Sequence, residues 1–355
     1  MIARSCGITS VVSLLAGVMG KKESALRQSL REWCWEAEDK KGRKRQAVDV
    51  SACFGPLLKW VVSAWSSEEK RIALAMDATS LKDNFVVLAI SVVYRGCAIP
   101  VAWTISRAGS KGKWKGEWLG LLRQLKGQIP TDWLVIVLAD RGLYANWLFT
   151  GIRRQGWHPF LRINSGGKYR LLRSSQWQFL HQVACHPGQE WSGAVVCFKS
   201  NPLRASLLVR WQEGYQDPWI IVTSLPPPQA NVAWYGMRSW IESGFKRTKR
   251  GGWQWQSTRM QDPARASRLW LAIAVATLWV VCVGGEADQN LPPSSLLTLP
   301  PTHIARRLAK SASRPRLVAC FKRGMVAILI ALFSHAPLPF GKFLPLPWPT
   351  LKTYP

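Results

Sequence analysis

One short segment of the sequence contains four side chains that could together bind a cation and the phosphates of a DNA backbone. They are Tyr235, Arg238, Glu242 and Lys249. If the segment is α-helical, at about 100° per residue, they share a stripe roughly 60° wide. The carboxylate on this stripe could hold a cation, and the basic and hydroxyl groups could bind DNA phosphates. The alternative is an ordinary amphipathic helix whose charged face is solvated.

Two further carboxylates follow apolar runs that read as buried strands. Asp77 comes directly after 72–76, and Asp140 comes directly after Trp133–Ala139. A buried carboxylate is costly without a cationic partner, and the carboxyl ends of strands are where open α/β sheets bind ligands. Either Asp alone could simply cap a turn or a helix. Together with Glu242 they predict a shared site.

Three carboxylates at one edge of a sheet suit metal-dependent phosphodiester chemistry. They could hold two divalent cations about 3.5–4 Å apart, one activating water or a 3′-hydroxyl and the other stabilising the leaving oxygen. Oxygen ligands favour Mg²⁺, with Mn²⁺ as a substitute. We therefore predict Asp77, Asp140 and Glu242 as catalytic residues and metal ligands.

The elements that must position these acids follow a βββαβαβ succession. After the strand that ends at Asp77 come segments whose patterns predict strands at 85–93 and 97–105, a helix at 116–127, the strand before Asp140, a helix at 144–154 and a strand at 157–163. This order predicts an α/β fold in which helices flank a mixed sheet. Short Trp-rich strands between 164 and 218 predict a β-rich insertion, and 219–223 predicts a strand that returns to the core.

The two ends of the chain differ from this central region. Apolar periodicity predicts helices at 24–38 and 53–65, with a basic cluster at 40–45 between them. This region is either a DNA-binding module or a helical cap with a solvated loop. The run 263–283 predicts a long helix packed across the sheet. A Pro- and Ser-rich linker at 291–301 and a basic tail from Thr302 follow.

The composition points to a polyanionic partner. Lys and Arg number 48 against 20 Asp and Glu, which gives a formal net charge of +28. Long DNA is the expected partner, and an anionic membrane surface is the competing one. The eight Cys form no CxxC pair, which is typical of reduced thiols in a cytosol. Lys21 and Lys22 after the apolar run 8–19 disfavour export, so we expect a soluble cytoplasmic protein without a membrane partner.

Three motifs together resemble the DDE transposases of bacterial insertion sequences that carry the YREK signature, the insertion-sequence family four type. The motifs are Met76-Asp-Ala-Thr-Ser-Leu81, Ala139-Asp-Arg-Gly-Leu-Tyr144 and Y-x2-R-x3-E-x6-K from Tyr235 to Lys249. The resemblance covers about 72–284. It implies a ribonuclease-H-like core interrupted by the β-rich insertion. It also implies cut-and-paste DNA transposition by a homodimer that binds double-stranded DNA at terminal inverted repeats and at the target.

The resemblance also implies roles for single residues. Tyr235, Arg238 and Lys249 would bind phosphates near the cleaved end, and Arg162 matches a basic position that relatives place against DNA. Trp219 matches a residue that stacks on a flipped base in relatives that form a hairpin. A buried aromatic at the start of a strand is the other interpretation of Trp219.

These predictions divide the chain into a helical region at 1–70 that binds the terminal repeats, a first core part at 71–163, the insertion at 164–218, a second core part at 219–290, and the linker with its basic tail at 291–355. Two other functions fit the same residues. One is a catalytically silent DNA-binding protein derived from a transposase, and the other is a stand-alone metal-dependent nuclease. In each case we expect the protein in the bacterial cytoplasm, associated with the nucleoid.

Overall fold

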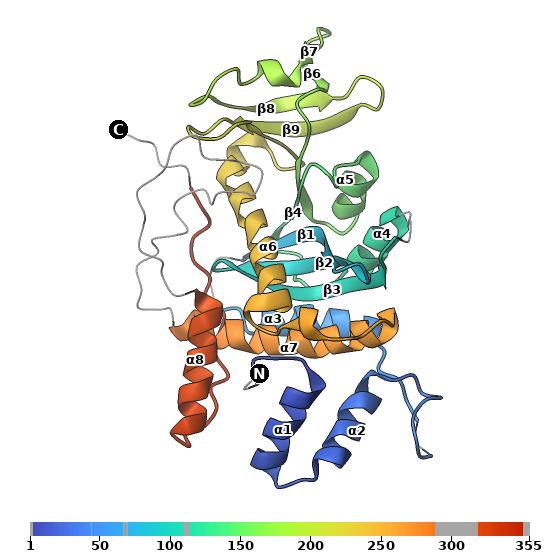
Figure 1. The fold of residues 1–355 in the computed structure, drawn as a ribbon. Helices are drawn as coiled ribbons and strands as arrows, with labels where there is room; N and C mark the ends of the chain where they lie inside the picture. The colour runs from blue at the N-terminus through green and yellow to red at the C-terminus, as the bar shows by residue number, and fades with distance from the viewer. Residues whose placement is uncertain are drawn as a thin grey trace.

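A mixed sheet of ten strands organises the residues that the computed structural model describes, which are 3–43, 45–66, 68, 70–109, 114–287 and 319–350 (Figure 1). The strand order is β3-β2-β1-β4-β5-β10-β9-β8-β6-β7. The first six strands in this order, up to β10, form the core, and the last four belong to the insertion. Figure 1 shows the insertion above the core and the N-terminal helices below it.

The core begins with an antiparallel meander and continues with parallel strands. β1 (Arg71–Leu81), β2 (Phe85–Tyr94) and β3 (Cys97–Arg107) pair antiparallel, whereas β4 (Leu134–Ala139) and β5 (His158–Arg162) run parallel to β1. Their apolar runs are nearly continuous because both faces of the sheet are covered. This topology confirms the predicted fold class, a ribonuclease-H-like mixed sheet flanked by helices.

Helices cover the core sheet. Two of them, α4 (Trp114–Gln124) and α5 (Asn146–Arg153), lie in the connections from β3 to β4 and from β4 to β5. α6 (Ser239–Lys246) crosses β1, β2 and β3, and α7 (Pro263–Ala287) lies along β3 (Figure 1). By length and composition α7 could span a membrane, but 67% of its most apolar window is buried within the protein. Its apolar character is therefore accounted for by its place in the core.

The insertion continues the core sheet. β10 (Trp219–Thr223) pairs antiparallel with both β5 and β9 (Leu203–Arg210), and β8 (Glu190–Cys197) pairs with β9. The short strands β6 (Lys168–Leu171) and β7 (Gln178–Phe179) complete this edge. A 3-10 turn at Leu180–Gln182 follows β7. Exposed and partly buried residues alternate along the first half of β8, as expected for a strand with one solvated face.

The N-terminal region is helical, as predicted, and is tied to α7 through one buried guanidinium. It contains α1 (Ile8–Met19), α2 (Glu23–Cys34), a 3-10 turn (Ser51–Cys53) and α3 (Phe54–Ser63). Arg268 of α7 donates to Glu36 Oε2 at 2.6 Å, to the Cys34 carbonyl at 2.9 Å and to the Val48 carbonyl at 3.3 Å. These bonds fix the end of α2 and the following loop against the core.

The C-terminal helix α8 (Cys320–Phe333) packs on α7 through backbone contact. A Cβ added at Gly284 would overlap the Cys320 carbonyl oxygen, and one added at Gly324 would overlap the Val280 carbonyl oxygen. Only glycine permits this approach. The predicted linker 291–301 and the basic residues of the tail up to Arg316 lie outside the described residues.

Candidate active site

Asp77 lies in the interior of β1 and not at its end, which corrects the sequence prediction. The strand continues to Leu81 through its pairing with β2. Its other neighbour, β4, stops earlier, at the pair Met76 with Ala139. From Asp77 onward, no described strand pairs with this edge of β1. Asp140 follows the last residue of β4, so both acids stand where β4 ends, and the predicted edge of the sheet is correct.

The segment with the third acid is helical throughout but is not one α-helix. It runs as a 3-10 helix (Val232–Arg238), then α6, then a π-helix (Arg247–Gly251). The Asn231 side chain accepts a hydrogen bond from the Ala233 N–H at the start, which satisfies one free donor of the first turn. The prediction of one α-helix with about 100° per residue is wrong at both ends of the segment, which are 3-10 and π-helical. Even so, Tyr235, Arg238 and Lys249 each contact a residue of the acidic edge.

One guanidinium stands among the three predicted acids. Arg238 Nη2 lies 2.9 Å from Asp77 Oδ2 and 3.8 Å from Asp140 Oδ2, and Arg238 Nη1 donates to Glu242 Oε1 one helical turn away. Arg238 is 3% exposed. The side chains of the acids are 19%, 16% and 20% exposed in the same order. The acids therefore converge on a shared cation, which in this structure is an arginine. We name this group the Arg238 cluster.

Two other members of the predicted stripe also bond to this edge. The Tyr235 hydroxyl donates to Asp140 Oδ1 at 3.2 Å, and its ring is fully buried. Lys249 Nζ donates to Thr79 Oγ1 at 2.6 Å. Thr79 stands two residues after Asp77 on β1 and therefore on the same face. Lys249 is half-buried and adds a positive charge beside the acids.

Burial shapes the charge states at the edge. It raises the pKa of Asp77, and the nearby Arg238 only partly opposes this rise. Burial also lowers the pKa of Lys249, and the neighbouring Arg250 adds to the decrease. Burial and the charge of Asp140 raise the pKa of the Tyr235 phenol, which therefore stays protonated as a donor. The carboxylate of Asp77 thus gains from any further cation that reaches it.

The donor set of the Arg238 cluster matches the chemistry of a hard divalent cation. Three carboxylates offer oxygen ligands, and Arg238 compensates only one of their charges. In the described part of the chain, however, no three Asp, Glu, His or Cys side chains lie close enough to one another to enclose an ion. The acids are spaced around the guanidinium. The oxygen ligands are of the type that Mg²⁺ or Mn²⁺ prefers, and the distances between the three carboxylates in this structure suit the larger guanidinium of Arg238.

A second charged group borders the first, and sequence reasoning missed it. Asp217 Oδ2 lies 3.0 Å from Arg162 Nη2 and 3.5 Å from Arg141 Nη1. We name these three residues the Asp217 cluster. Acidic residues are scarce in this chain, and Asp217 stands two residues before a buried strand. That scarcity is the signal that could have drawn attention to it.

The two residues expected to touch DNA from the insertion side lie inside the protein. Arg162 is 4% exposed and also donates to the Pro218 carbonyl at 3.4 Å. Trp219 is buried, and its ring meets that of Tyr235 edge-on at a centroid distance of 5.1 Å. In this structure both residues contact side chains that border the acids, Arg162 through Asp217 and Trp219 through Tyr235. Their contact with DNA stays a prediction.

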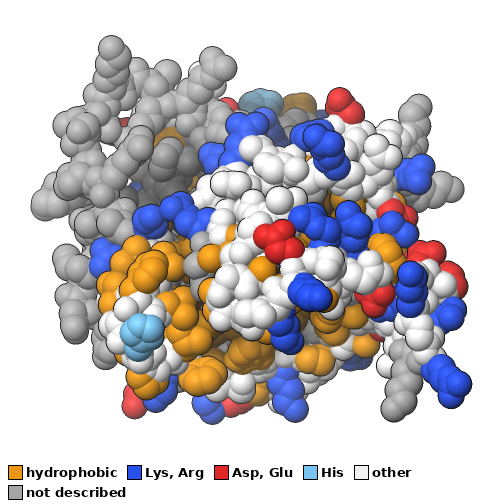
Figure 2. Space-filling model, turned by 60° about the horizontal axis from the view of Figure 1, so that its bottom comes forward, with side chains coloured by type: hydrophobic (Ala, Val, Ile, Leu, Met, Phe, Trp, Pro, Cys, Tyr) orange, Lys and Arg blue, Asp and Glu red, His pale blue; other side chains and the backbone are white. Residues whose placement is uncertain are grey.

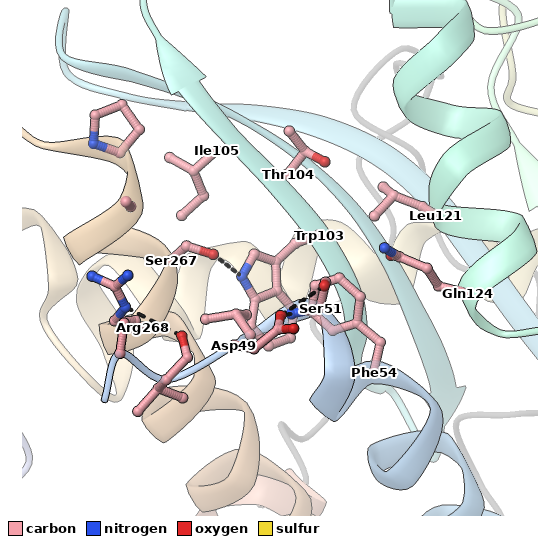
Figure 3. Close-up of a pocket in the computed structure, with 15 residues that line it drawn as sticks. Asp49, Ser51, Phe54, Trp103, Thr104, Ile105, Leu121, Gln124, Ser267 and Arg268 are labelled. Atoms are coloured by element: carbon pink, nitrogen blue, oxygen red, sulfur yellow. Dashed lines mark hydrogen bonds between the residues drawn. The ribbon is translucent and has the colours of Figure 1, made fainter. Parts of the chain in front are cut away.

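A cavity of about 580 Å³ lies elsewhere, between the loop before α3, β3 and the start of α7 (Figure 3). The Trp103 indole N–H donates to Ser267 Oγ at 3.0 Å on its wall. Asp49 accepts from the N–H and the hydroxyl of Ser51, which forms the turn before α3. None of the predicted site residues lines this cavity.

Comparison with known proteins gives one family. The sequence pattern described as transposase DDE domain matches residues 70–279, which includes every predicted site residue. The search of curated proteins gave no match.

Two solved structures are also similar at low levels. Human ENDOV is 10% identical, over 64% of this chain and 97% of that chain, with a TM-score of 0.24. The C-terminal lobe of a budding yeast Argonaute is 10% identical, over 68% of this chain and 56% of that chain, with a TM-score of 0.21. Similarities this low carry no inference about the chain.

Proposed function

Because the chain belongs to the transposase DDE domain family, we propose that it is the transposase of a bacterial insertion sequence of the YREK type. It would cleave double-stranded DNA at terminal inverted repeats and join the freed 3′ ends to target DNA, a cut-and-paste reaction. The observation that carries this proposal is the convergence of Asp77, Asp140 and Glu242 on one guanidinium.

In the proposed reaction these three carboxylates hold Mg²⁺, with Mn²⁺ as a substitute. When bound, the metal would supply an activated water or 3′-hydroxyl and would stabilise the leaving oxygen. The protein's own contribution is orientation. Asp140 receives the Tyr235 hydroxyl and the Arg141 N–H on Oδ1, which leaves Oδ2 turned toward the shared cation position.

Arg238 and Lys249 supply positive charge at this edge. Lys249 is the more accessible of the two, and we propose that it exchanges Thr79 for a phosphate next to the cleaved bond. The positive charge of Arg238 offsets part of the negative charge of the acids. Arg238 can therefore bind a phosphate only where a metal ion supplies that positive charge instead. Tyr235 is buried against Asp140, so its proposed effect on phosphate binding runs through that carboxylate.

The remaining parts of the proposal concern the partners. The excess of Lys and Arg favours DNA, and we assign recognition of the repeats to residues 1–70. Arg162 and Trp219 would contact DNA, the latter through a flipped base, only after the insertion edge opens. The protein would act in the cytoplasm on nucleoid DNA.

We propose a homodimer, and one apolar surface supports it. Hydrophobic side chains gather on the underside of the molecule (Figure 2). Val326, Ile330 and Phe333 lie exposed at helical spacing along α8. A second copy that packs there would remove these apolar side chains from water. Light scattering with and without DNA ends measures the state, and a monomer under both conditions would contradict the dimer.

The test of the catalytic proposal uses a supercoiled plasmid that bears the element's ends, with Mg²⁺. We expect Asp77→Ala, Asp140→Ala and Glu242→Ala each to slow cleavage by about 100-fold or more, since each removes a ligand of the metal that activates the reaction. Asp132→Ala is the matched control, because Asp132 forms an exposed ion pair with Lys70 at the opposite end of β1. Cleavage that persists in any of the three variants would remove the mechanism.

A silent DNA-binding protein is the second candidate, and the position of Arg238 favours it. A guanidinium that already stands between the three acids would suit a protein in which arginine takes the place of the metal. Titration with Mn²⁺ separates the two. Binding that Asp77→Ala weakens supports the transposase, whereas DNA-end binding without Mn²⁺ binding or nicking supports the silent protein.

A further inference from the structure

The Asp217 cluster ties the insertion to the loop that carries Asp140. Asp217 lies between β9 and β10, in the last part of the chain before the core strand β10 begins. Its carboxylate bonds Arg162 at the end of β5 and Arg141 in the loop after β4. Two connections of the sheet and the last residue of β5 therefore meet at one carboxylate.

Burial makes this carboxylate a requirement of the fold at that point. The Arg162 side chain is 4% exposed, and a buried guanidinium without a hydrogen-bonded acid is strongly unfavourable. The backbone of Arg162 also faces Ile221 in the pairing of β5 with β10. Asp217 and Arg162 therefore fix the start of β10 at the edge of the core.

From this point two chains of contacts lead to the same oxygen of Asp140. In the first, Asp217 holds the Arg141 side chain at 3.5 Å, and the Arg141 N–H donates to Asp140 Oδ1 at 2.8 Å. In the second, Trp219 packs against the Tyr235 ring, and the Tyr235 hydroxyl donates to Asp140 Oδ1 at 3.2 Å. Oδ1 is thus occupied by two donors, and Oδ2 faces the Arg238 guanidinium.

We propose that Asp217 is a positioning residue of the active site. It holds Arg141 and the start of β10 so that Asp140 presents Oδ2 to the position of the shared cation. The role of the metal in this inference rests on the proposed function. Residues that orient a metal-binding side chain typically change metal affinity by about 10-fold to 100-fold when they are replaced.

The test compares the wild-type full chain with Asp217→Ala and Asp217→Glu. Glu190→Ala is the control, because Glu190 pairs with Arg210 at 3.5 Å in the insertion, and no bond within the described part of the chain joins it to the acidic edge. Hydrogen–deuterium exchange of the segment 139–145 reports how firmly the Asp140 loop is held. Titration with Mn²⁺, followed by electron paramagnetic resonance, reports affinity without requiring cleavage.

We expect Asp217→Ala to exchange faster in 139–145 and to bind Mn²⁺ about 10-fold more weakly. Asp217→Glu, which keeps the charge, should recover part of both effects, and Glu190→Ala should show neither. Unchanged exchange in 139–145, or unchanged Mn²⁺ affinity in a wild type that binds Mn²⁺, would overturn the proposal. A folded wild type that binds no Mn²⁺ would overturn both the proposed function and the metal-positioning role. The exchange data would then still decide whether Asp217 holds the loop.

Discussion

The two charged clusters at the edge of the core sheet have opposite compositions. In the Arg238 cluster one guanidinium stands among three carboxylates. In the Asp217 cluster one carboxylate stands between two guanidiniums. The first therefore carries excess negative charge and the second excess positive charge. They meet at Asp140 and Arg141, which are consecutive in the chain.

This difference separates two kinds of ligand along one surface. A deficit of positive charge among half-buried carboxylates attracts a cation, and a surplus beside it attracts a phosphate. The clusters also differ in access to water. The central residue of the first is almost fully buried, whereas the Asp217 side chain is 39% exposed. The same kind of ion pair should therefore have different energetic consequences in the two places.

Removing the buried arginine from each cluster tests that difference, and we expect the largest effect at Arg238. In Arg238→Met three carboxylates lose their shared cation, so the protein should lose about 3–5 kcal/mol of unfolding free energy. In Arg162→Met the remaining Asp217 can be hydrated and keeps Arg141, so the loss should be smaller, about 1–3 kcal/mol. Urea denaturation at neutral pH measures both.

Arg265→Met provides the control for these two changes. Arg265 pairs with Asp39 at 3.0 Å, and both side chains are more than a third exposed. An exposed pair of this kind contributes about 1 kcal/mol or less. Added Mn²⁺ should restore part of the stability of Arg238→Met and none of that of Arg162→Met. Equal losses in the two buried-arginine variants would contradict the comparison.

The sequence allowed us to predict that these acids lie at one edge of the sheet, because the features that indicate this are local. An apolar run that ends in Asp is visible for both Asp77 and Asp140, and the order of strands follows from alternating patterns. The position of Asp77 within β1 was not visible, because the strand continues only through its pairing with β2. The end of β4 decides where the edge begins.

The partners within each cluster could not be predicted, because they come from distant segments. Nothing in the spacing of Asp217, Arg141 and Arg162 indicates that they meet, since the sheet brings them together. Arg238 was predicted to face DNA phosphates, and its position among the acids depends on how the 3-10 helix Val232–Arg238 packs on β1 and β4. The π-helix at Arg247–Gly251 also lies outside any pattern based on 3.6 residues per turn.

The next prediction concerns pH and sharpens the account of the negative cluster. Burial raises the pKa of Asp77 above its ordinary value of 3.8. The folded protein therefore holds this proton more tightly than the unfolded chain, so ionisation of Asp77 reduces stability. The reduction is absent below the ordinary pKa and complete above the raised one. Asp77→Asn should gain stability relative to wild type as the pH rises from about 3 to 7.

Asp132→Asn gives the opposite sign and serves as the control. The hydrogen bond from Lys70 lowers the pKa of Asp132, so its ionised form is favoured in the folded protein. This variant should lose stability relative to wild type as the pH rises through the same range. Urea denaturation at several pH values measures both curves. Curves with the same sign would show that burial does not dominate at Asp77.

The smallest expected effect distinguishes the clusters by their contact with DNA. Lys249 bonds Thr79 at the acidic edge and Arg141 follows Asp140 in the chain, and both are partly accessible, so each should neutralise about one phosphate. Lys249→Ala and Arg141→Ala should each reduce the slope of log affinity against log salt by about 0.9. Lys70→Ala, at the opposite end of β1, should leave the slope unchanged. The measurement is a binding titration on labelled DNA ends over a range of salt concentrations.

If only Lys249→Ala changes the slope, DNA phosphates contact the Arg238 cluster alone, and the excess positive charge around Asp217 stabilises the fold. If both variants change it, the DNA spans the two clusters, and Asp140 lies beneath the backbone between them.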